Sequence, residues 1–335
     1  MASTTTRLLA DLTAEGLLPP AQAAAIAEDE RTRPFSLHHE LRALLYLGSV
    51  LLAGGLGVLI YENRDSLGQE IITAFIALAM AAAFGYAARH RPAFTWQEAP
   101  RTRIAADYLL VLSCLLFLVL EGYVQVAYGV FGTRYGLVTL LPAVLFLGLA
   151  YRFDHRGVLA MGLTALAAWV GVKVAPLALF TGQGFPAHEL SGPGLLLGLG
   201  LLAVGLASER LGRKAHFAYT YLLLGSNVAL VAALTRLFEV IGDAGVLRLQ
   251  ALLITLLVLG ICTLLGWYAR RTQSYLFLLL AVGYGYVAIT SLVVLLAQLG
   301  GLEGVLWPLA FLYFPLTLLG IILFFINIKK ILRIA

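Results

Sequence analysis

The stretch Leu41–Glu70, LRALLYLGSVLLAGGLGVLIYENRDSLGQE, decides the fold of this chain. Its residues 41–61 form an apolar run whose one charged residue is Arg42, and residues 62–70 follow as a short charged loop. A helix needs about 20 apolar residues to cross the roughly 30 Å hydrocarbon core of a bilayer. The stretch therefore predicts a first transmembrane helix over residues 41–61 and a turn back toward the membrane after it.

The composition extends this prediction to most of the chain. Only 12% of the 335 residues are charged, 61% are hydrophobic, and the mean hydropathy is +0.91, whereas a soluble domain has about 25% charged residues. Only helices and closed barrels satisfy their backbone groups in lipid, and long, unalternating apolar runs favour helices. We therefore predict an all-α polytopic transmembrane helix bundle.

About ten spans are expected. They cover residues 41–61, 69–88, 104–128, 134–151, 157–180, 192–208, 215–236, 247–268, 272–297 and 304–328. The sixth is short and rich in glycine, and prolines predict interruptions at Pro142, Pro176 and Pro315. The domains expected are an N-terminal segment, residues 1–34, a transmembrane bundle, residues 41–328, and a basic tail, residues 329–335.

The basic residues predict the orientation of the bundle. Eighteen of the 23 Lys and Arg residues fall on one side of the predicted spans, four fall on the other, and Lys173 lies within a span. Those on the first side are Arg7, Arg31, Arg33, Arg42, Arg89, Arg91, Arg101, Arg103, Arg152, Arg156, Arg210, Arg213, Lys214, Arg270, Arg271, Lys329, Lys330 and Arg333. Loops rich in Lys and Arg stay in the cytoplasm, so both termini are expected there.

Residues 1–34 are expected to form a small cytoplasmic helical hairpin. Leu8, Leu9 and Leu12 share one face of a first helix that Gly16 ends, and Pro19-Pro20 fits the start of a second. The hairpin either rests on the membrane surface or docks a regulatory partner.

These features together resemble a known family. The Gly-Leu-Leu-Pro-Pro break at residues 16–20, the glycine-rich first span and the loop Glu62-Asn63-Arg64-Asp65-Ser66-Leu67-Gly68 are similar to a family of uncharacterised bacterial predicted integral membrane proteins, a domain of unknown function. Many members have Asn-Trp-Asp where this chain has Asn63-Arg64-Asp65. The resemblance covers residues 1–90 best, implies a bacterial inner membrane, and transfers no catalytic residue.

An internal repeat is a further hypothesis. At an offset of 177 residues, Leu47-Gly48-Ser49 aligns with Leu224-Gly225-Ser226, and Glu62 aligns with Glu239. Spans 1–4 would then repeat as spans 7–10 in the same direction, as in some transporters. Chance matching of apolar helices is the alternative.

The third span carries a polar stripe. Asp107, Cys114, Glu121 and Tyr128 are seven residues apart, and Gln125 follows Glu121 by four, so these side chains share one helix face. Ionisable groups inside spans are costly and usually face the bundle interior. Either Glu121 belongs to a solute or proton pathway, or the stripe is a structural contact between helices.

Other polar groups lie within spans or at their outer ends. Lys173 lies at a depth similar to that of Glu121, and it either pairs with Glu121 or extends to the outer surface. Asn227 is expected near the midplane, and Arg236 is placed to pair with Glu239. With the outer loop of Glu62, Asn63, Arg64 and Asp65, these groups line either an outer polar cavity or a solvated rim.

Motifs for enzymes and cofactors are missing from the sequence. Gly54-Gly55-Leu56-Gly57 lies inside a span, so it is no nucleotide loop. His38-His39-Glu40 sits at the entry of a span, and no His/Cys cluster has zinc spacing. We expect no metal, no cofactor and no nucleic-acid partner.

Three functions remain. The favoured one is a transporter of a small solute or ion with a polar cavity open to the outer side. A membrane scaffold or sensor that acts through the N-terminal hairpin is the alternative, and an intramembrane enzyme on a lipid-linked substrate fits least. The partners considered are the lipid bilayer, a second copy of the chain and a cytoplasmic protein at the hairpin.

Overall fold

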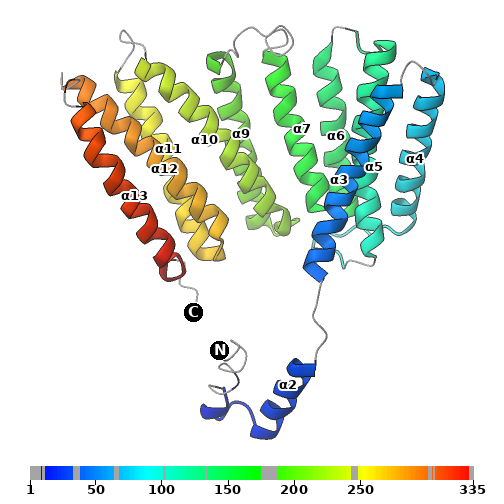
Figure 1. Ribbon diagram of the computed structural model, residues 1–335, viewed down its shortest axis with the longest axis horizontal. Helices are drawn as coiled ribbons and strands as arrows, with labels where there is room; N and C mark the ends of the chain where they lie inside the picture. Colours follow the sequence, from blue (N-terminus) through cyan, green and yellow to red (C-terminus); the bar gives the residue numbers. More distant parts are fainter. Residues whose placement is uncertain are drawn as a thin grey trace. The chain divides into compact units, whose positions relative to one another are not determined.

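The computed structural model describes residues 9, 12–32, 38–63, 68–100, 103–132, 134–174, 187–242, 248–300, 304 and 306–331. The described residues form helices, turns and loops (Figure 1). The chain divides into two compact units, Met1–Leu52 and Ala53–Ala335, and each is described by itself.

The first unit contains the helix α2 (Pro20–Thr32) and the first part of α3 (His38–Asn63). Residues 12–14 form a helical turn that ends at Gly16, where the backbone is left-handed (φ 72°) and the Leu17 N–H donates to the Leu12 carbonyl. Glycine adopts this conformation without strain. The predicted helix stop at Gly16 and helix start at Pro19-Pro20 are therefore confirmed.

The second unit consists of long helices in which chain neighbours run antiparallel (Figure 1). After the end of α3 come α4 (Gln69–Arg89), α5 (Ile104–Tyr128), α6 (Tyr135–Phe153), α7 (Arg156–Val174), α9 (Ala187–Leu211), the 3₁₀ turn η1 (Ala215–Phe217), α10 (Ala218–Gly242), α11 (Arg248–Thr272), α12 (Tyr275–Leu299) and α13 (Leu306–Ile331). Among the residues that the structure describes, eight helices are long and apolar enough to cross a membrane, and α3 and α7 hold the shorter apolar stretches Ala43–Val58 and Arg156–Val172. The polytopic helix bundle is thus confirmed, whereas ten spans and cytoplasmic termini stay predictions.

Two expectations about individual spans were wrong. The sixth span is not short, because α9 has 25 residues and begins before Pro193. Its first residues are polar and were therefore left out of the predicted apolar span, but they are helical. Pro142 and Pro315 lie inside continuous helices, because packing in a bundle tolerates the hydrogen bond that each proline removes. Pro176 lies outside the described residues.

The closest helix pair is α9 with α10, and glycine makes it possible. A Cβ atom on Gly198 would collide with the backbone of Ala229, and one on Gly225 would lie 2.9 Å from the Leu201 Cβ. Gly194 faces Ala232 in the same way, so the Gly194-x-x-x-Gly198 spacing packs helices. In Gly132-x-x-x-Gly136, by contrast, Gly132 lies in a turn with φ 53°.

The core of the second unit surrounds α10. Leu230 and Leu237 of α10 are fully buried, as is Phe277 of α12. The pairs α4–α5, α6–α7, α9–α10 and α11–α12 each pack as a hairpin, and α10 also contacts α7, α11 and α12. The predicted repeat of spans 1–4 in spans 7–10 remains a hypothesis.

Candidate functional site

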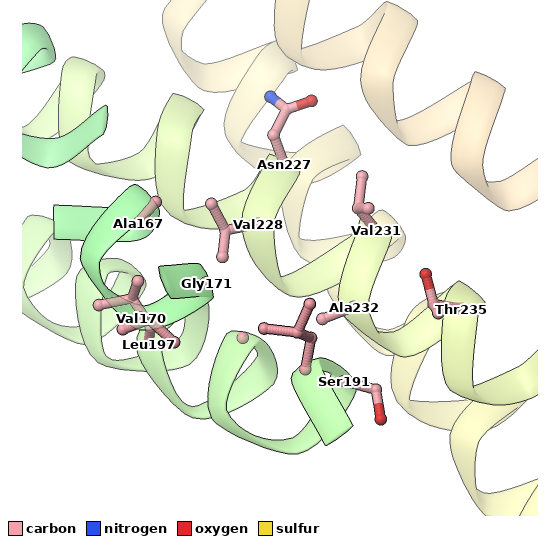
Figure 2. A pocket seen from close by; sticks show the side chains of 12 residues that line it. Ala167, Val170, Gly171, Ser191, Leu197, Asn227, Val228, Val231, Ala232 and Thr235 are labelled. Atoms are coloured by element: carbon pink, nitrogen blue, oxygen red, sulfur yellow. The ribbon is translucent and has the colours of Figure 1, made fainter. Parts of the chain in front are cut away.

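A cavity of about 390 Å³ lies between α7, α9 and α10 (Figure 2). The residues that line it are Ala167, Val170, Gly171, Leu190, Ser191, Gly194, Leu197, Asn227, Val228, Val231, Ala232 and Thr235. Gly171 comes from the last turn of α7, Leu190 from the first turn of α9 and Thr235 from the second half of α10. The cavity therefore lies toward one end of the bundle and reaches the middle of α10 at Asn227.

The wall of this cavity is mainly apolar. Its polar lining residues are Ser191, Asn227 and Thr235, and none of the lining residues that the structure describes is charged. The Asn227 amide points away from Gly171 and Leu197 (Figure 2). Its Nδ2 donates to the Leu223 carbonyl at 2.8 Å, and its Oδ1 accepts from the Tyr284 hydroxyl at 3.0 Å. Asn227 thus joins α10 to α12, the interhelical role that polar residues often take in membranes.

The third span contains three predicted pathway residues, Asp107, Gln125 and Glu121, and each has a different environment. Asp107 lines a small polar pocket with His90, Arg91 and Arg103. Gln125 holds the turn after α5, because its Nε2 donates to the Gly132 carbonyl at 3.1 Å and its Oε1 accepts from the Phe131 N–H at 2.9 Å.

Glu121 is buried in α5, with 7% of its surface exposed. Within the described part of the chain, its Oε1 atom has no hydrogen-bond partner, and the same is true of the Tyr123 hydroxyl. Burying a polar group without a partner costs about 1–3 kcal/mol, so these two groups are exceptional. Glu121 does not line the cavity between α7, α9 and α10.

The remaining predicted residues are placed only in part. Arg236 pairs with Glu239 across 3.3 Å, as expected, but both side chains are partly exposed and Arg236 does not line the cavity. Lys173 belongs to α7, and α3 ends with Glu62 and Asn63, but the structure does not describe the side chains of these three residues. Arg64 and Asp65 lie outside the described residues. Of the predicted pathway residues that are described, Asn227 alone lines the cavity.

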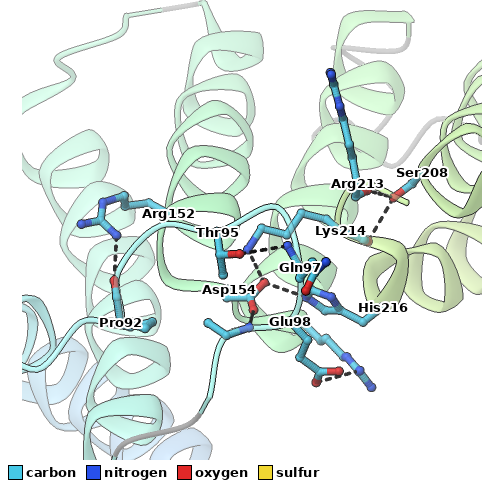
Figure 3. A network of polar contacts seen from close by, with 12 residues as sticks. Pro92, Thr95, Gln97, Glu98, Arg152, Asp154, Ser208, Arg213, Lys214 and His216 are labelled. Atoms are coloured by element: carbon cyan, nitrogen blue, oxygen red, sulfur yellow. Dashed lines mark hydrogen bonds and ion pairs between the residues drawn. The ribbon is translucent and has the colours of Figure 1, made fainter. Parts of the chain in front are cut away.

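Figure 3 shows a buried ionic cluster around Asp154. It lies where α6 ends and α7 begins, at the end of the bundle opposite to the cavity, which we call the basic end. Asp154 follows α6 with a left-handed backbone, φ 57°. Its Oδ1 accepts from Lys214 Nζ at 2.6 Å and lies 2.7 Å from His216 Nε2, and its Oδ2 accepts from the Ala99 N–H at 2.6 Å. The cluster therefore joins the α4–α5 loop, the α6–α7 turn and the α9–η1 turn.

The side chains of the cluster are removed from solvent. Those of Lys214, Asp154 and His216 are 1%, 6% and 7% exposed. Burial raises the pKa of the Asp154 carboxyl, but the Ala99 N–H, Lys214 and His216 outweigh it, so the pKa lies below its ordinary value. The carboxylate is consequently charged at neutral pH and compensates Lys214.

Backbone contacts complete the cluster. The Lys214 N–H donates to the Trp96 carbonyl at 2.6 Å, and the Ser208 hydroxyl contacts the Lys214 carbonyl at 3.0 Å. The Lys214 ammonium also lies 5.5 Å from the ring centre of Phe94 and 5.7 Å from that of Phe217. These bonds describe a structural clasp rather than an open binding site.

Sequence reasoning missed this clasp. Lys214 was counted only as one of the basic residues that predict orientation. The available signal was the pair Asp154-His155 directly after one span and Lys214-Ala215-His216 directly before another, at the same end of the bundle. Similarly, Arg152 donates to the Pro92 carbonyl at 3.1 Å and Arg156 pairs with Glu98, so several of these cations also hold loops.

Residues 10–159 match the family described as "Predicted membrane protein (DUF2157)", so the match extends beyond the 90 residues on which the resemblance was strongest. No curated protein matches the chain, and neither does any solved structure.

Proposed function

Because residues 10–159 match a family of predicted membrane proteins of unknown function, we propose the activity from the bundle itself: transport of a small, uncharged and largely apolar solute. The observation that carries the proposal is the cavity between α7, α9 and α10. Its volume, about 390 Å³, falls in the range of about 300–1,000 Å³ that is usual for small-molecule sites.

The lining of the cavity supports an uncharged solute over an ion. An ion would lose its hydration against the described wall of the cavity, which is mainly Ala, Val, Leu and Gly and holds no charged residue, and such desolvation is costly. The sequence had led us to expect a small solute or an ion in a polar cavity. The proposal is narrower, because it keeps the uncharged solute and leaves out ions.

The orientation is part of the same proposal. With the basic end in the cytoplasm of a bacterium, as the positive-inside rule predicts, the cavity lies in the outer half of the inner membrane. Solute would enter from the outer side and meet the cavity before the tightly packed α9–α10 contact near Gly198.

Sided chemical labelling tests transport without knowledge of the solute. The test uses a variant in which cysteine replaces Val228, a cavity-lining residue near the middle of α10. Cys114 and Cys262 are changed to serine in the same variant. A transporter exposes its solute site to each side in turn. A thiol reagent with an uncharged reactive head, kept from crossing the membrane by a long polar tail, should therefore modify Val228→Cys both in right-side-out and in inverted vesicles. Labelling from one side only, or from neither, would contradict transport.

Gly260→Cys in α11 is the matched control. Gly260 is exposed near the middle of α11, and a Cβ atom there meets nothing within 4 Å. A thiol at this position should face lipid and react from neither side. Reaction at Gly260→Cys would show that the reagent crosses the membrane, and the assay would then be repeated with a bulkier charged reagent.

A scaffold or sensor is the second candidate, and the first unit favours it. Leu17 is 70% exposed and Ile26 44% exposed in a unit that is compact by itself, so an apolar surface is available to a partner. A photo-reactive amino acid at position 26 should crosslink a cytoplasmic protein in cells if this function holds, and crosslinks to lipid alone would contradict it.

A further inference from the structure

Glu121 of α5 is a buried carboxyl group that no contact among the described residues explains. Oε1 of Glu121 and the hydroxyl of Tyr123 are the two buried side-chain polar atoms without a hydrogen-bond partner in the described part of the chain. No described ion pair includes Glu121. Asp154 is the useful contrast, because that carboxyl is equally buried and is held by Lys214.

The surroundings of Glu121 are apolar. Residues four and seven positions earlier on the same helix face, Phe117 and Cys114, line an apolar cavity between α4, α5 and α6. On the α4 side, Ile72 and Ile76 pack against Val119, Leu120 and Tyr123 of α5. A carboxylate in such surroundings would lose its hydration with nothing in exchange, so it is neutralised instead.

The register of α5 against α6 brings a backbone carbonyl to about the level of Glu121, although no described hydrogen bond joins the two groups. The rings of Phe117 and Phe146 lie 5.9 Å apart, and because the two helices are antiparallel, Glu121 lies near the level of Pro142. Pro142 is buried within α6 and has no N–H, so the Val138 carbonyl lacks its usual helical donor. A protonated carboxyl can donate a hydrogen bond, whereas a carboxylate only accepts.

We propose that Glu121 is a proton-binding site of this membrane protein. Its carboxyl group binds a proton and is uncharged at neutral pH, and it releases the proton to water as the pH rises. In this step the Glu121 O–H bond breaks, the electron pair remains on the carboxylate, and water takes the proton. The site lies outside the cavity between α7, α9 and α10, so its use as a coupling group for a solute rests on the proposed transport function, whereas proton binding itself does not.

The titratable neighbours of this site lie near the ends of their helices. On α5 and on the packed elements α3, α4, α6 and α7, the groups toward the Glu121 end of the bundle are Glu62, Glu70, Tyr123, Tyr128, Arg134, Tyr135 and Lys173. Among the described side chains of this set, none makes an ion pair with Glu121.

Infrared spectroscopy of the full chain in lipid vesicles tests the proposal directly. A protonated buried carboxyl gives a C=O stretching band above the amide I band, and an ionised one does not. At neutral pH the wild-type protein should show this band, E121Q should lack it, and raising the pH should remove it from the wild type. Asp154→Asn is the matched control and should leave the band unchanged, because Asp154 is charged.

Two results would overturn the proposal. No band attributable to Glu121 at any pH would mean that Glu121 is ionised and paired, and a band that persists at every pH at which the protein stays folded would mean that no proton is released. Glu121→Asp, which keeps the carboxyl group, should shift the band rather than remove it, and it replaces E121Q if that variant does not fold.

The role in transport is tested separately. In the Val228→Cys protein, E121Q should restrict labelling to one side of the membrane if proton release drives the change of access. If wild-type Val228→Cys is itself labelled from one side only, the transport function fails while the infrared result stands.

Discussion

Lys214 and Asp154 form a buried ion pair 2.6 Å long between residues sixty positions apart. The pair joins the turn after α6 to the turn before η1, and the Ala99 N–H brings the α4–α5 loop to the same carboxylate. Three connections of the second unit are thereby fixed at one charged group. A bundle whose helices lie in lipid gains little from hydrophobic burial between them, so polar contacts at its ends matter more.

Removing one partner of this pair should destabilise the bundle strongly. Lys214→Met breaks the buried pair and leaves the Asp154 carboxylate with His216 and the Ala99 N–H as its described partners, and breaking a buried pair costs about 3–5 kcal/mol. Thermal unfolding in detergent should therefore occur at a clearly lower temperature than in the wild type. The double variant Asp154→Asn, Lys214→Met should lose less than the sum of the two single losses, because no charge is then stranded.

Glu98→Gln is the control for this prediction. Glu98 pairs with Arg156 at the same end of the bundle, but the two side chains are 57% and 45% exposed, and exposed pairs contribute about 0–1 kcal/mol. If Glu98→Gln lowered the unfolding temperature as much as Lys214→Met, any change at the basic end would destabilise the bundle. The buried pair would then have no special role in stability.

The pH dependence of the clasp follows from the lowered pKa of Asp154. A carboxyl whose pKa is lower in the folded protein stabilises it above the ordinary pKa, about 3.9, and this contribution is lost as the pH falls through the folded-state pKa. The stability difference between wild type and Asp154→Asn should therefore be constant from neutral pH to about pH 4 and shrink below it. A difference that vanished between pH 7 and 5 would contradict a pKa of Asp154 below its ordinary value.

Local signals in the sequence were sufficient for single helices. The third span was predicted over residues 104–128, and α5 is Ile104–Tyr128, because Arg103 precedes the apolar run and Gly129 ends it with a left-handed backbone whose N–H bonds to the Gln125 carbonyl. The glycine spacing in α9 likewise indicated close packing.

Contacts between distant segments could not be predicted in this way. The rule that orients a membrane protein counts each cation separately, so it cannot show that Lys214 is buried against Asp154 rather than exposed. The cavity was missed for the same reason: its wall is formed by Val, Ala and Gly residues of three helices, and no single one of these residues differs from an ordinary lipid-facing or packing residue. The polar residues that did stand out are mostly engaged elsewhere, as Gln125 is in its turn.

The α9–α10 contact gives a prediction about glycine. Gly198→Ala places a Cβ atom against the Ala229 backbone, which is closer than atoms can lie, and forced overpacking of this kind costs about 1–3 kcal/mol. Gly200→Ala, two residues away on the same helix, meets nothing within 4 Å and should gain slightly from the better helix propensity of alanine. Thermal unfolding of both variants should show opposite signs, and equal effects would mean that α9 and α10 are not closely packed in the membrane.

The cavity itself is tested by filling it. Gly171 lines the cavity, and a Cβ atom at this position has open space around it, so Gly171→Leu should fit without strain and occupy part of the volume. In the Val228→Cys protein this change should abolish labelling by the impermeant thiol reagent while the unfolding temperature is kept or raised. Gly260→Leu adds the same side chain to α11, away from the cavity, and should leave the labelling of Val228→Cys unchanged. If Gly171→Leu does not reduce labelling although the protein is folded, the reagent reaches position 228 by another route, and the cavity is not the path that the proposed transport requires.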